Sequence, residues 1–182
     1  MTKQDTAFGE RAAAHYEAWY ETPNGQQVDK LEKALLGQLL RVFSQADNVL
    51  EIGCGTGHFA RWLSGDGLLA VGVDLSAAML AEARVLGGVP LVRGDAQRLS
   101  FVDGAFDLTV LITTLEFLGQ PRDALVEALR VSRQGSDPGC TQPLQHARLA
   151  APAGRVFSRN RLRYGAFLQR WGVAASAAVD HR

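Results

Sequence analysis

The chain has 182 residues, of which 47% are hydrophobic and 21% charged. This composition is typical of a globular protein of about one domain, and it excludes a collagen, a coiled coil and a disordered chain. No apolar run approaches the ~20 residues that a membrane-spanning helix needs. The polar N-terminus is not a secretory signal, and two cysteines are too few for a disulfide framework. The composition therefore predicts a soluble, cytoplasmic protein without a membrane span.

The charges are unevenly distributed along the chain, although they sum to zero. Residues 1–135 contain 12 Lys and Arg against 17 Asp and Glu, whereas residues 136–182 contain 7 against 2. Nucleic-acid binding depends on neutralising phosphates, so the acidic part predicts no nucleic-acid partner. The reversal near residue 135 also sets the last segment apart from the rest of the chain.

The first 45 residues are predicted to form two helices. Apolar side chains recur at helical spacing over residues 8–20 and again over residues 26–43. Between them, residues 22–25 read Thr-Pro-Asn-Gly, which is a strong turn signal. We therefore expect a helical hairpin before the first strand.

Strands and helices alternate from residue 48 onward. Strands are predicted over residues 48–52, 68–73, 90–93 and 106–113, and helices over residues 58–63, 77–85 and 121–132. In the last helix, Leu125, Ala128 and Leu129 are predicted to lie on one face. Apolar strands that alternate with helices indicate a parallel sheet covered on both faces. We predict an α/β fold with a Rossmann-like, doubly wound, mostly parallel sheet that is truncated after the fourth strand and its helix.

A glycine-rich loop follows the first predicted strand, where residues 51–57 read Glu-Ile-Gly-Cys-Gly-Thr-Gly. Ligands of doubly wound sheets bind at the carboxyl ends of the strands, and glycine lets the backbone approach a ligand closely. A dinucleotide-binding loop would need its third glycine where His58 stands. The carboxylate of Glu51 also suits a cationic ligand better than a pyrophosphate. A purely structural glycine turn is the alternative.

Acidic residues follow the second and third predicted strands. Asp74 lies 17 residues after Gly57, close to the ~20 expected of a ribose-binding acid. The alternative, that Asp74 only caps the next helix, is weakened because Ser76 can serve as that cap. The carboxylate of Asp95 is placed to hydrogen-bond an exocyclic amine, with Ala96 lying against a base. An ordinary loop acid is the alternative at Asp95.

These strand ends, taken in order, resemble the class I S-adenosylmethionine-dependent methyltransferases. The subgroup is the one named for ubiquinone and menaquinone biosynthesis enzymes, with a methyltransferase type 11 domain. The matching segments are residues 49–57, 71–79, 94–101 and 106–117. Residues 16–25 are also similar to a lid found in some small-molecule members. The resemblance extends over residues 8–135.

The resemblance implies a cofactor-binding role at each strand end. Two lid tyrosines would close over the site, and the first strand end would hold the methionine part with its amino group. The acid after the second strand would bind the ribose hydroxyls, the third strand end would meet the adenine, and the fourth would line the methionyl side. The implied set is Tyr16, Tyr20, Glu51, Gly53, Cys54, Gly55, Gly57, Asp74, Leu75, Met79, Asp95, Ala96, Gln97, Ile112 and Thr113. For the tyrosines, Leu75 and Met79, packing in the core is the alternative.

The implied reaction moves a methyl group from S-adenosylmethionine to a small-molecule acceptor and leaves S-adenosylhomocysteine. The sulfonium is already activated, so the protein mainly aligns the reactants in a dry pocket. We therefore predict no catalytic residue and no metal, and we expect His58 to pack or to face solvent. The alternative function is a non-catalytic S-adenosylmethionine-binding protein or an inactive truncated methyltransferase fragment. A nicotinamide-dependent oxidoreductase is disfavoured by Glu51 and His58.

The regular pattern stops after Gly135. Pro138 and Pro143 stand where a fifth strand is expected, and a central strand does not tolerate proline. With suitable synonymous codons, residues 135–149 read one base out of register encode an apolar strand, a turn and a helix start. We hypothesise that residues 136–182 are a frameshifted tail, with a divergent basic segment as the alternative. The predicted organisation is a helical lid over residues 1–45, a cofactor-binding core over residues 46–135 and this anomalous basic tail.

Overall fold

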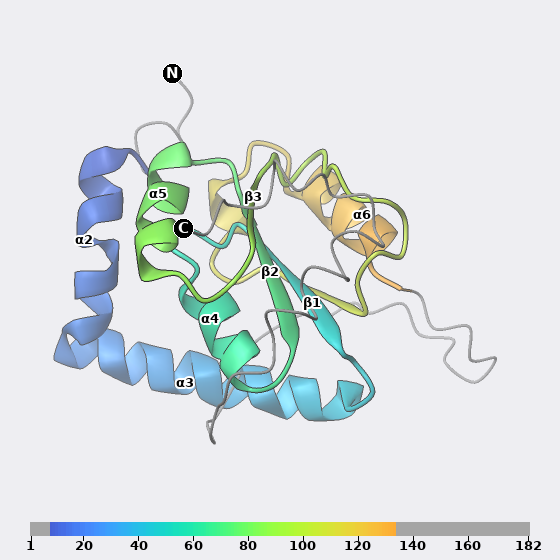
Figure 1. Cartoon of the computed structure of the whole chain (residues 1–182), viewed down its shortest axis with the longest axis horizontal. Coiled ribbons are helices and arrows are strands. Elements are labelled where there is room, and N and C mark those ends of the chain that lie inside the picture. The colour runs from blue at the N-terminus through green and yellow to red at the C-terminus, as the bar shows by residue number, and fades with distance from the viewer. Residues whose placement is uncertain (1–7, 134–182) are drawn as a thin grey trace.

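Four parallel strands form the centre of the fold in the computed structural model, which describes residues 8–133 (Figure 1). Their order in the sheet is β3-β2-β1-β4. The strands are β1 (Asn48–Ile52), β2 (Leu69–Asp74), β3 (Leu91–Arg93) and β4 (Leu108–Val110). The helices are α2 (Glu10–Glu21), α3 (Pro23–Leu40), α4 (His58–Gly65), α5 (Ala77–Leu86) and α6 (Pro121–Val131), with 3₁₀ turns η1 (Arg41–Phe43) and η2 (Leu115–Phe117). This arrangement confirms the predicted Rossmann-like parallel sheet.

Helices cover both faces of the sheet, because successive side chains of each strand point to opposite sides. Val49 of β1 belongs to a buried cluster shared with α4 and α5, whereas Leu50 belongs to a second cluster shared with α6. Figure 1 shows α4 and α5 on one side of β1 and β2, and α6 on the other. By the same alternation, Glu51 lies on the side of Val49. A carboxyl group therefore enters the layer where α4 packs on the sheet.

Two predicted boundaries are corrected by the structure. Residues 22–25 are the start of α3 rather than a turn before it, because Thr22 caps the helix and accepts a hydrogen bond from Gly25 N at 3.0 Å. Strand β4 is shorter than residues 106–113, since Val110 already pairs with Glu51 near the end of β1. Beyond β4 the chain bends away at Thr113, whose φ is +46°.

The leucines of α6 do not lead its packing on the sheet. Leu125 and Leu129 are 44% and 39% exposed, and the buried residues of the helix are Ala124, Ala128 and Val131. The period is helical as predicted, but a different face packs on the sheet. The aromatic pair Phe101 and Phe106 already fills the space beneath α6, so small side chains face it.

The chain returns to the sheet after α6. Phe106 N donates to Val131 O at 3.0 Å, and Arg133 N donates to Phe106 O at 2.6 Å, which forms a parallel bridge between Phe106 and Ser132. This bridge occupies the place of the fifth strand that the fold class leads one to expect. The frameshift hypothesis for residues 136–182 lies outside the described residues and stays a prediction. Within residues 8–133, no helix is both long and apolar enough to cross a bilayer.

Asn48 and Asp107 hold the beginnings of β1 and β4 together. Asp107 Oδ2 accepts hydrogen bonds from Asn48 Nδ2 at 2.7 Å and from the backbone nitrogens of Asp47 and Asn48. In return, Asp107 N donates to Asn48 Oδ1 at 2.9 Å. The Asn48 residue is buried, with 6% exposure, so these bonds replace water that cannot reach it.

We expect Asn48→Ala to lower the free energy of unfolding by ~1–3 kcal/mol, because it removes the two hydrogen bonds between the Asn48 side chain and Asp107. Urea denaturation followed by circular dichroism measures the change. Asp66→Ala, at the exposed end of α4, is the control and should stay near the wild-type value. Equal midpoints for wild type and Asn48→Ala would show that the pair contributes nothing.

Candidate functional site at the carboxyl ends of the strands

A cleft of about 1060 Å³ opens at the carboxyl ends of the strands. Residues that follow all four strands line it, and side chains of α2 and α3 form its remaining wall. The cleft lies where a doubly wound sheet binds its ligands, beyond the strand ends and beside the switch in strand order at β1. The position follows from the parallel topology, because only parallel strands bring all their carboxyl ends to one edge.

Most of the predicted cofactor-binding residues are brought together on the wall of this cleft. These are Tyr16, Tyr20, Gly53, Gly55, Asp74, Leu75, Met79, Asp95, Ala96, Ile112 and Thr113. The lining does not include Glu51, Cys54, Gly57 or Gln97. The sequence therefore located the cleft, but some of the predicted residues lie behind its surface.

The glycine loop after β1 needs glycine for conformation and for space. The φ values of Gly53, Gly55 and Gly57 are +75°, +54° and +78°, in the left-handed region that favours glycine. A Cβ atom on Gly53 would stand 2.3 Å from Thr114 Cγ2, whereas one on Gly55 would meet only Tyr16 Cε1, at 3.9 Å. Gly53 is thus packed against the end of β4, and Gly55 presents its backbone to the cleft.

Glu51 is a buried carboxyl group directly behind this loop. The residue is 2% exposed, and Oε2 has no hydrogen-bond partner among residues 8–133. Burial raises the pKa of Glu51 to about 8, and the nearby charge of Asp74 adds to the increase. A buried acid with a free oxygen is costly unless a ligand meets it. Glu51 therefore fits a ligand with a cationic donor.

Cys54 and Gly57 face the interior rather than the cleft. Cys54 is 5% exposed, and its Sγ would be 2.7 Å from a Cβ atom on Gly72 of β2. Burial raises the pKa of the Cys54 thiol well above its usual range. Gly57 precedes α4 and faces Arg61 and the core. Through these two positions the loop can offer a ligand backbone atoms only.

Asp74 joins the ends of β1 and β2. Its Oδ2 accepts a hydrogen bond from Gly55 N at 2.8 Å, and its Oδ1 accepts one from Ser76 N at 2.8 Å. Burial raises the pKa of Asp74. The cap of α5 is Ser76, whose hydroxyl accepts from Met79 N at 3.2 Å. Asp74 is thus not the helix cap, and it combines a structural role in the loop with a carboxylate on the cleft wall.

The loop after β3 holds Asp95 toward the cleft and Gln97 away from it. Asp95 Oδ1 accepts from Gln97 N at 2.9 Å and from Gln97 Nε2 at 3.2 Å. Gln97 Oε1 accepts from Gln120 N at 2.8 Å, which ties this loop to the start of α6. The structure therefore gives Gln97 a bridging place, distinct from the adenine contact that the resemblance implied.

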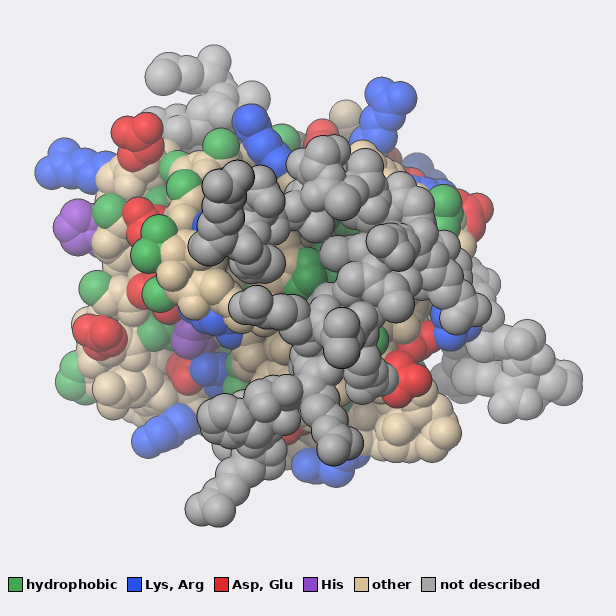
Figure 2. All heavy atoms as spheres, viewed as in Figure 1, with side chains coloured by type: hydrophobic (Ala, Val, Ile, Leu, Met, Phe, Trp, Pro, Cys, Tyr) green, Lys and Arg blue, Asp and Glu red, His purple; other side chains and the backbone are tan. Residues whose placement is uncertain are grey.

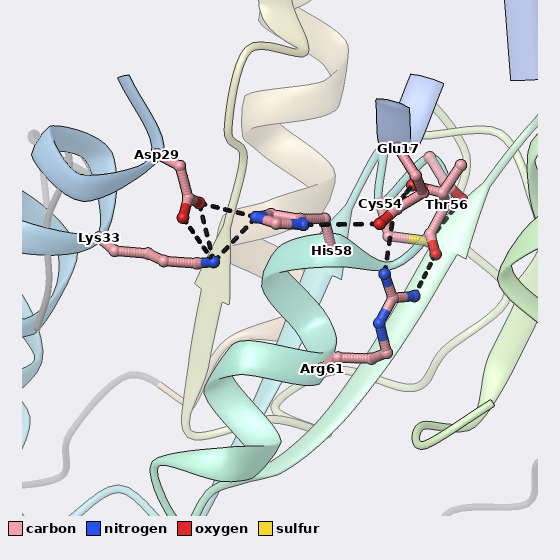
Figure 3. Close-up of polar contacts among 8 residues, drawn as sticks. Glu17, Asp29, Lys33, Cys54, Thr56, His58 and Arg61 are labelled. Carbon is pink, nitrogen blue, oxygen red and sulfur yellow. Dashed lines mark hydrogen bonds and ion pairs between the residues drawn. The ribbon is translucent and has the colours of Figure 1, made fainter. Parts of the chain in front are cut away.

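Sequence reasoning missed a polar cluster behind the glycine loop (Figure 3). It joins Glu17 of α2 to Thr56, His58 and Arg61. As expected, His58 packs: its ring lies on the ring of Tyr20 with centroids 3.7 Å apart and 5° between the planes. Helical spacing makes Glu17 and Arg61 look like solvated surface charges, so no sequence signal pointed to the pairing.

Thr114, which was not among the predicted cofactor-binding residues, also has a structural place at the strand ends. The buried hydroxyl of Thr114 donates to Ile52 O at 3.2 Å and to Ile112 O at 2.9 Å, which ties the end of β4 to that of β1. Within residues 8–133 there is no group of three or more His, Cys, Asp and Glu that could hold a metal ion. The cleft therefore presents hydrogen-bonding groups and carboxylates.

The residues present fit the cofactor that the strand ends implied. The unpartnered oxygen of Glu51 suits the amino group of S-adenosylmethionine, and the open backbone at Gly55 suits close approach of its methionine part. The residues Asp74 and Asp95, which carry carboxyl groups, line the same cleft. A cationic nucleoside matches this acidic lining.

Comparison with known proteins agrees with the fold. The family model for the methyltransferase domain matches residues 50–137. Demethylmenaquinone methyltransferase of Mycolicibacterium vanbaalenii is 39% identical over 137 residues, which are 75% of this chain and 56% of that protein. Malonyl-[acyl-carrier protein] O-methyltransferase of Enterobacter lignolyticus is 33% identical over 135 residues, 71% of this chain and 49% of that protein.

A solved structure extends the likeness to three dimensions. A SAM-dependent methyltransferase from Thermotoga maritima superposes with a TM-score of 0.55 at 32% identity, covering 69% of this chain and 56% of that one. The chain spans about half the length of the curated relatives it matches. The match of the family model contains the glycine loop, the end of β1 and strands β2, β3 and β4. Residues 50–137 therefore match a methyltransferase domain, and in sequence and fold the chain is similar to S-adenosylmethionine-dependent methyltransferases.

Proposed function

We propose that this chain transfers a methyl group from S-adenosylmethionine to a small-molecule acceptor. The proposal rests above all on Glu51, a buried acid with a free oxygen behind a glycine loop whose backbone faces the cleft. That combination suits an amino acid-like cation. The pyrophosphate of a dinucleotide would instead bring negative charge next to the carboxyl group of Glu51, which is unfavourable. The methyltransferase relatives support the assignment.

Bound S-adenosylmethionine supplies an activated methyl group on a sulfonium. The chain's own residues then bind and orient: Glu51 accepts hydrogen bonds from the amino group, and Asp74 accepts them from the ribose hydroxyls. Tyr16 and Tyr20 cover the cleft from α2 and keep water out. Holding the two reactants in line in a dry site accounts for most of the acceleration such a reaction needs. The step breaks the bond from sulfur to the methyl carbon and forms one from that carbon to the acceptor, and a proton that the acceptor carries passes to solvent.

The acceptor is proposed to be small because its place is a partly enclosed cleft. Trp19 and Val28 from the N-terminal helices and Phe117 from η2 form apolar walls beside the cofactor region. On the face seen in Figure 2, acidic and basic side chains of the described residues are interspersed. Such a surface does not suit a nucleic-acid backbone, which needs clustered Lys and Arg. A small organic acceptor fits these walls best.

Binding of S-adenosylhomocysteine and of NAD, each measured by isothermal titration calorimetry, tests the cofactor class. We expect S-adenosylhomocysteine to bind in the micromolar range or tighter and NAD to bind at least tenfold more weakly, on the order of 1.4 kcal/mol. Tighter binding of NAD, or no heat with S-adenosylhomocysteine, would end the methyltransferase assignment. Turnover is tested separately, by release of S-adenosylhomocysteine in the presence of candidate acceptors.

Glu51 should release a proton when the cofactor product binds. Because the pKa of Glu51 is raised to about 8, the group is mostly protonated at pH 7 without ligand. An ammonium group beside it favours the carboxylate and lowers that pKa. We therefore expect the heat of S-adenosylhomocysteine binding at pH 7 to differ between phosphate and Tris buffers. In Glu51→Gln, which cannot titrate, this difference should vanish; equal heats in wild type would contradict the assigned contact.

Asp74→Asn should weaken S-adenosylhomocysteine binding by ~1–3 kcal/mol, because it replaces a carboxylate that accepts from the ribose. The amide keeps one oxygen for the bond from Gly55 N, so the loop stays closer to its native form than in an alanine variant. Calorimetry gives the affinity, and Asp66→Asn, on the exposed end of α4, is the matched control. An unchanged affinity in Asp74→Asn would remove Asp74 from the ribose site.

A further inference from the structure

Helix α2 carries two of the cleft's tyrosines but has little apolar anchorage. Tyr16 and Tyr20 line the cleft, and Tyr16 is the side chain nearest to Gly55 of the glycine loop. Yet Ala13 is the only fully buried residue of the helix. Burial of one alanine contributes little stabilisation, on the order of 1 kcal/mol. Tyr20 packs partly against the core and contacts the ring of Phe59, so polar contacts must supply the rest of what holds the helix over the site.

Glu17 connects α2 directly to the glycine loop. Its Oε1 accepts a hydrogen bond from the hydroxyl of Thr56, which stands between Gly55 and Gly57 and is fully buried. Arg61 of α4 completes the contact, because Nη2 donates to Glu17 at 3.1 Å and Nη1 donates to Thr56 O at 2.5 Å. Figure 3 shows these groups converging behind the loop. One carboxylate is thus held by the loop and by the helix that follows it.

A second set of contacts joins the start of α4 to α3. His58 Nε2 lies 2.7 Å from Asp29 Oδ1, and Nδ1 lies 3.8 Å from Glu17 Oε2. Lys33 Nζ pairs with Asp29 at 2.8 Å. The ring of Tyr20 stacks on the imidazole. The N-terminal helices therefore rest on the start of α4 through charged and stacked groups.

Partial burial makes the ion pair between Glu17 and Arg61 stronger than a fully exposed ion pair. Burial alone would raise the pKa of Glu17, but His58, Thr56 and Arg61 outweigh it and lower the pKa to about 2. The Glu17 and Arg61 side chains are 34% and 23% exposed, so solvent screens the pair only in part. Charge-assisted hydrogen bonds of this kind are stronger than neutral ones.

We propose that Glu17 is a positioning residue that seats α2 against the glycine loop and thereby holds Tyr16 and Tyr20 over bound cofactor. This inference rests on the proposed function, since it assigns the tyrosines to the cofactor site. Thr56 and Arg61 are its partners, and the three together are named the Glu17 cluster. When the cluster breaks, α2 moves off the cleft and the ligand leaves. The cluster therefore controls the lifetime of the bound state.

Glu17→Gln tests the proposal, with Glu21→Gln, at the exposed end of the same helix, as the matched control. We expect S-adenosylhomocysteine to dissociate about tenfold faster from Glu17→Gln, because a charge-assisted contact is lost. Stopped-flow displacement followed by tryptophan fluorescence gives the rate, since Trp19 lines the cleft. The association rate should change little. An unchanged dissociation rate would overturn the proposal.

Hydrogen exchange of the ligand-free protein distinguishes a local loosening of α2 from a loss of stability of the whole protein. In Glu17→Gln, the amides of α2 should exchange faster while those of β1 and β2 stay as in the wild type. Exchange that is unchanged in α2, or faster to the same extent everywhere, would contradict a positioning role. Because this measurement needs no ligand, it tests the cluster even if S-adenosylhomocysteine fails to bind. Failure to bind would instead reject the proposed function.

Thr56 offers a conservative pair of variants. Thr56→Ser keeps the hydroxyl that donates to Glu17 and should retain wild-type exchange in α2. Thr56→Val keeps the shape but removes the donor, and should reproduce the effect of Glu17→Gln. Wild-type behaviour of Thr56→Val would show that the hydroxyl does not seat the helix.

Discussion

The hydrogen bond from Gly55 N to Asp74 Oδ2 joins the two strand ends around which the cleft is built. It fixes the glycine loop against β2, and the left-handed φ of the loop glycines lets the chain turn sharply enough to reach it. Thr114 ties the end of β4 to the end of β1 in the same region. Without these contacts, the parallel sheet would still form its core, but the open backbone at Gly55 would have no fixed position.

Acidic groups concentrate where the sheet ends, and their burial gives the cleft its preference. The pKa values of Glu51 and Asp74 are both raised by burial, and the nearby charge of Asp74 raises the pKa of Glu51 further. In the ligand-free protein, ionising these buried carboxyl groups therefore costs free energy. A cation that enters the cleft relieves that cost. This is the physical reason why a sulfonium nucleoside with an amino group suits the site better than a pyrophosphate.

Helix α2 is held by a different kind of contact from the rest of the fold, whereas α3 places Leu36 in the buried core. The sheet and helices α4, α5 and α6 pack through buried apolar side chains. Helix α2 instead rests on the Glu17 cluster and on stacking of Tyr20 with His58. Polar contacts at a partly exposed place break at lower cost than a packed core. This difference suits a segment that must admit and release a ligand.

Periodicity and strand-end residues were enough to predict the parallel sheet, the succession of strands and helices along the chain, and a cleft at the glycine loop. The apolar pattern specifies which segments become strands, and parallel topology then places their carboxyl ends together. The alternation along β1 also puts Glu51 beneath the loop. These features depend on local sequence and on general rules of chain connection, so the sequence alone determined them.

Only the tertiary structure decided which faces pack and which charges pair. The exposed Leu125 of α6 shows that helical period does not choose the face, because neighbours from distant segments compete for the same space. The hydrogen bond between Gln97 and Gln120 likewise joins two segments that no local pattern connects. The pairing of Glu17 with Thr56 and Arg61 joins residues about 40 positions apart, and no local pattern marks it. Such contacts arise because a side chain of α2 reaches the glycine loop and α4, which happens only when the whole fold is assembled.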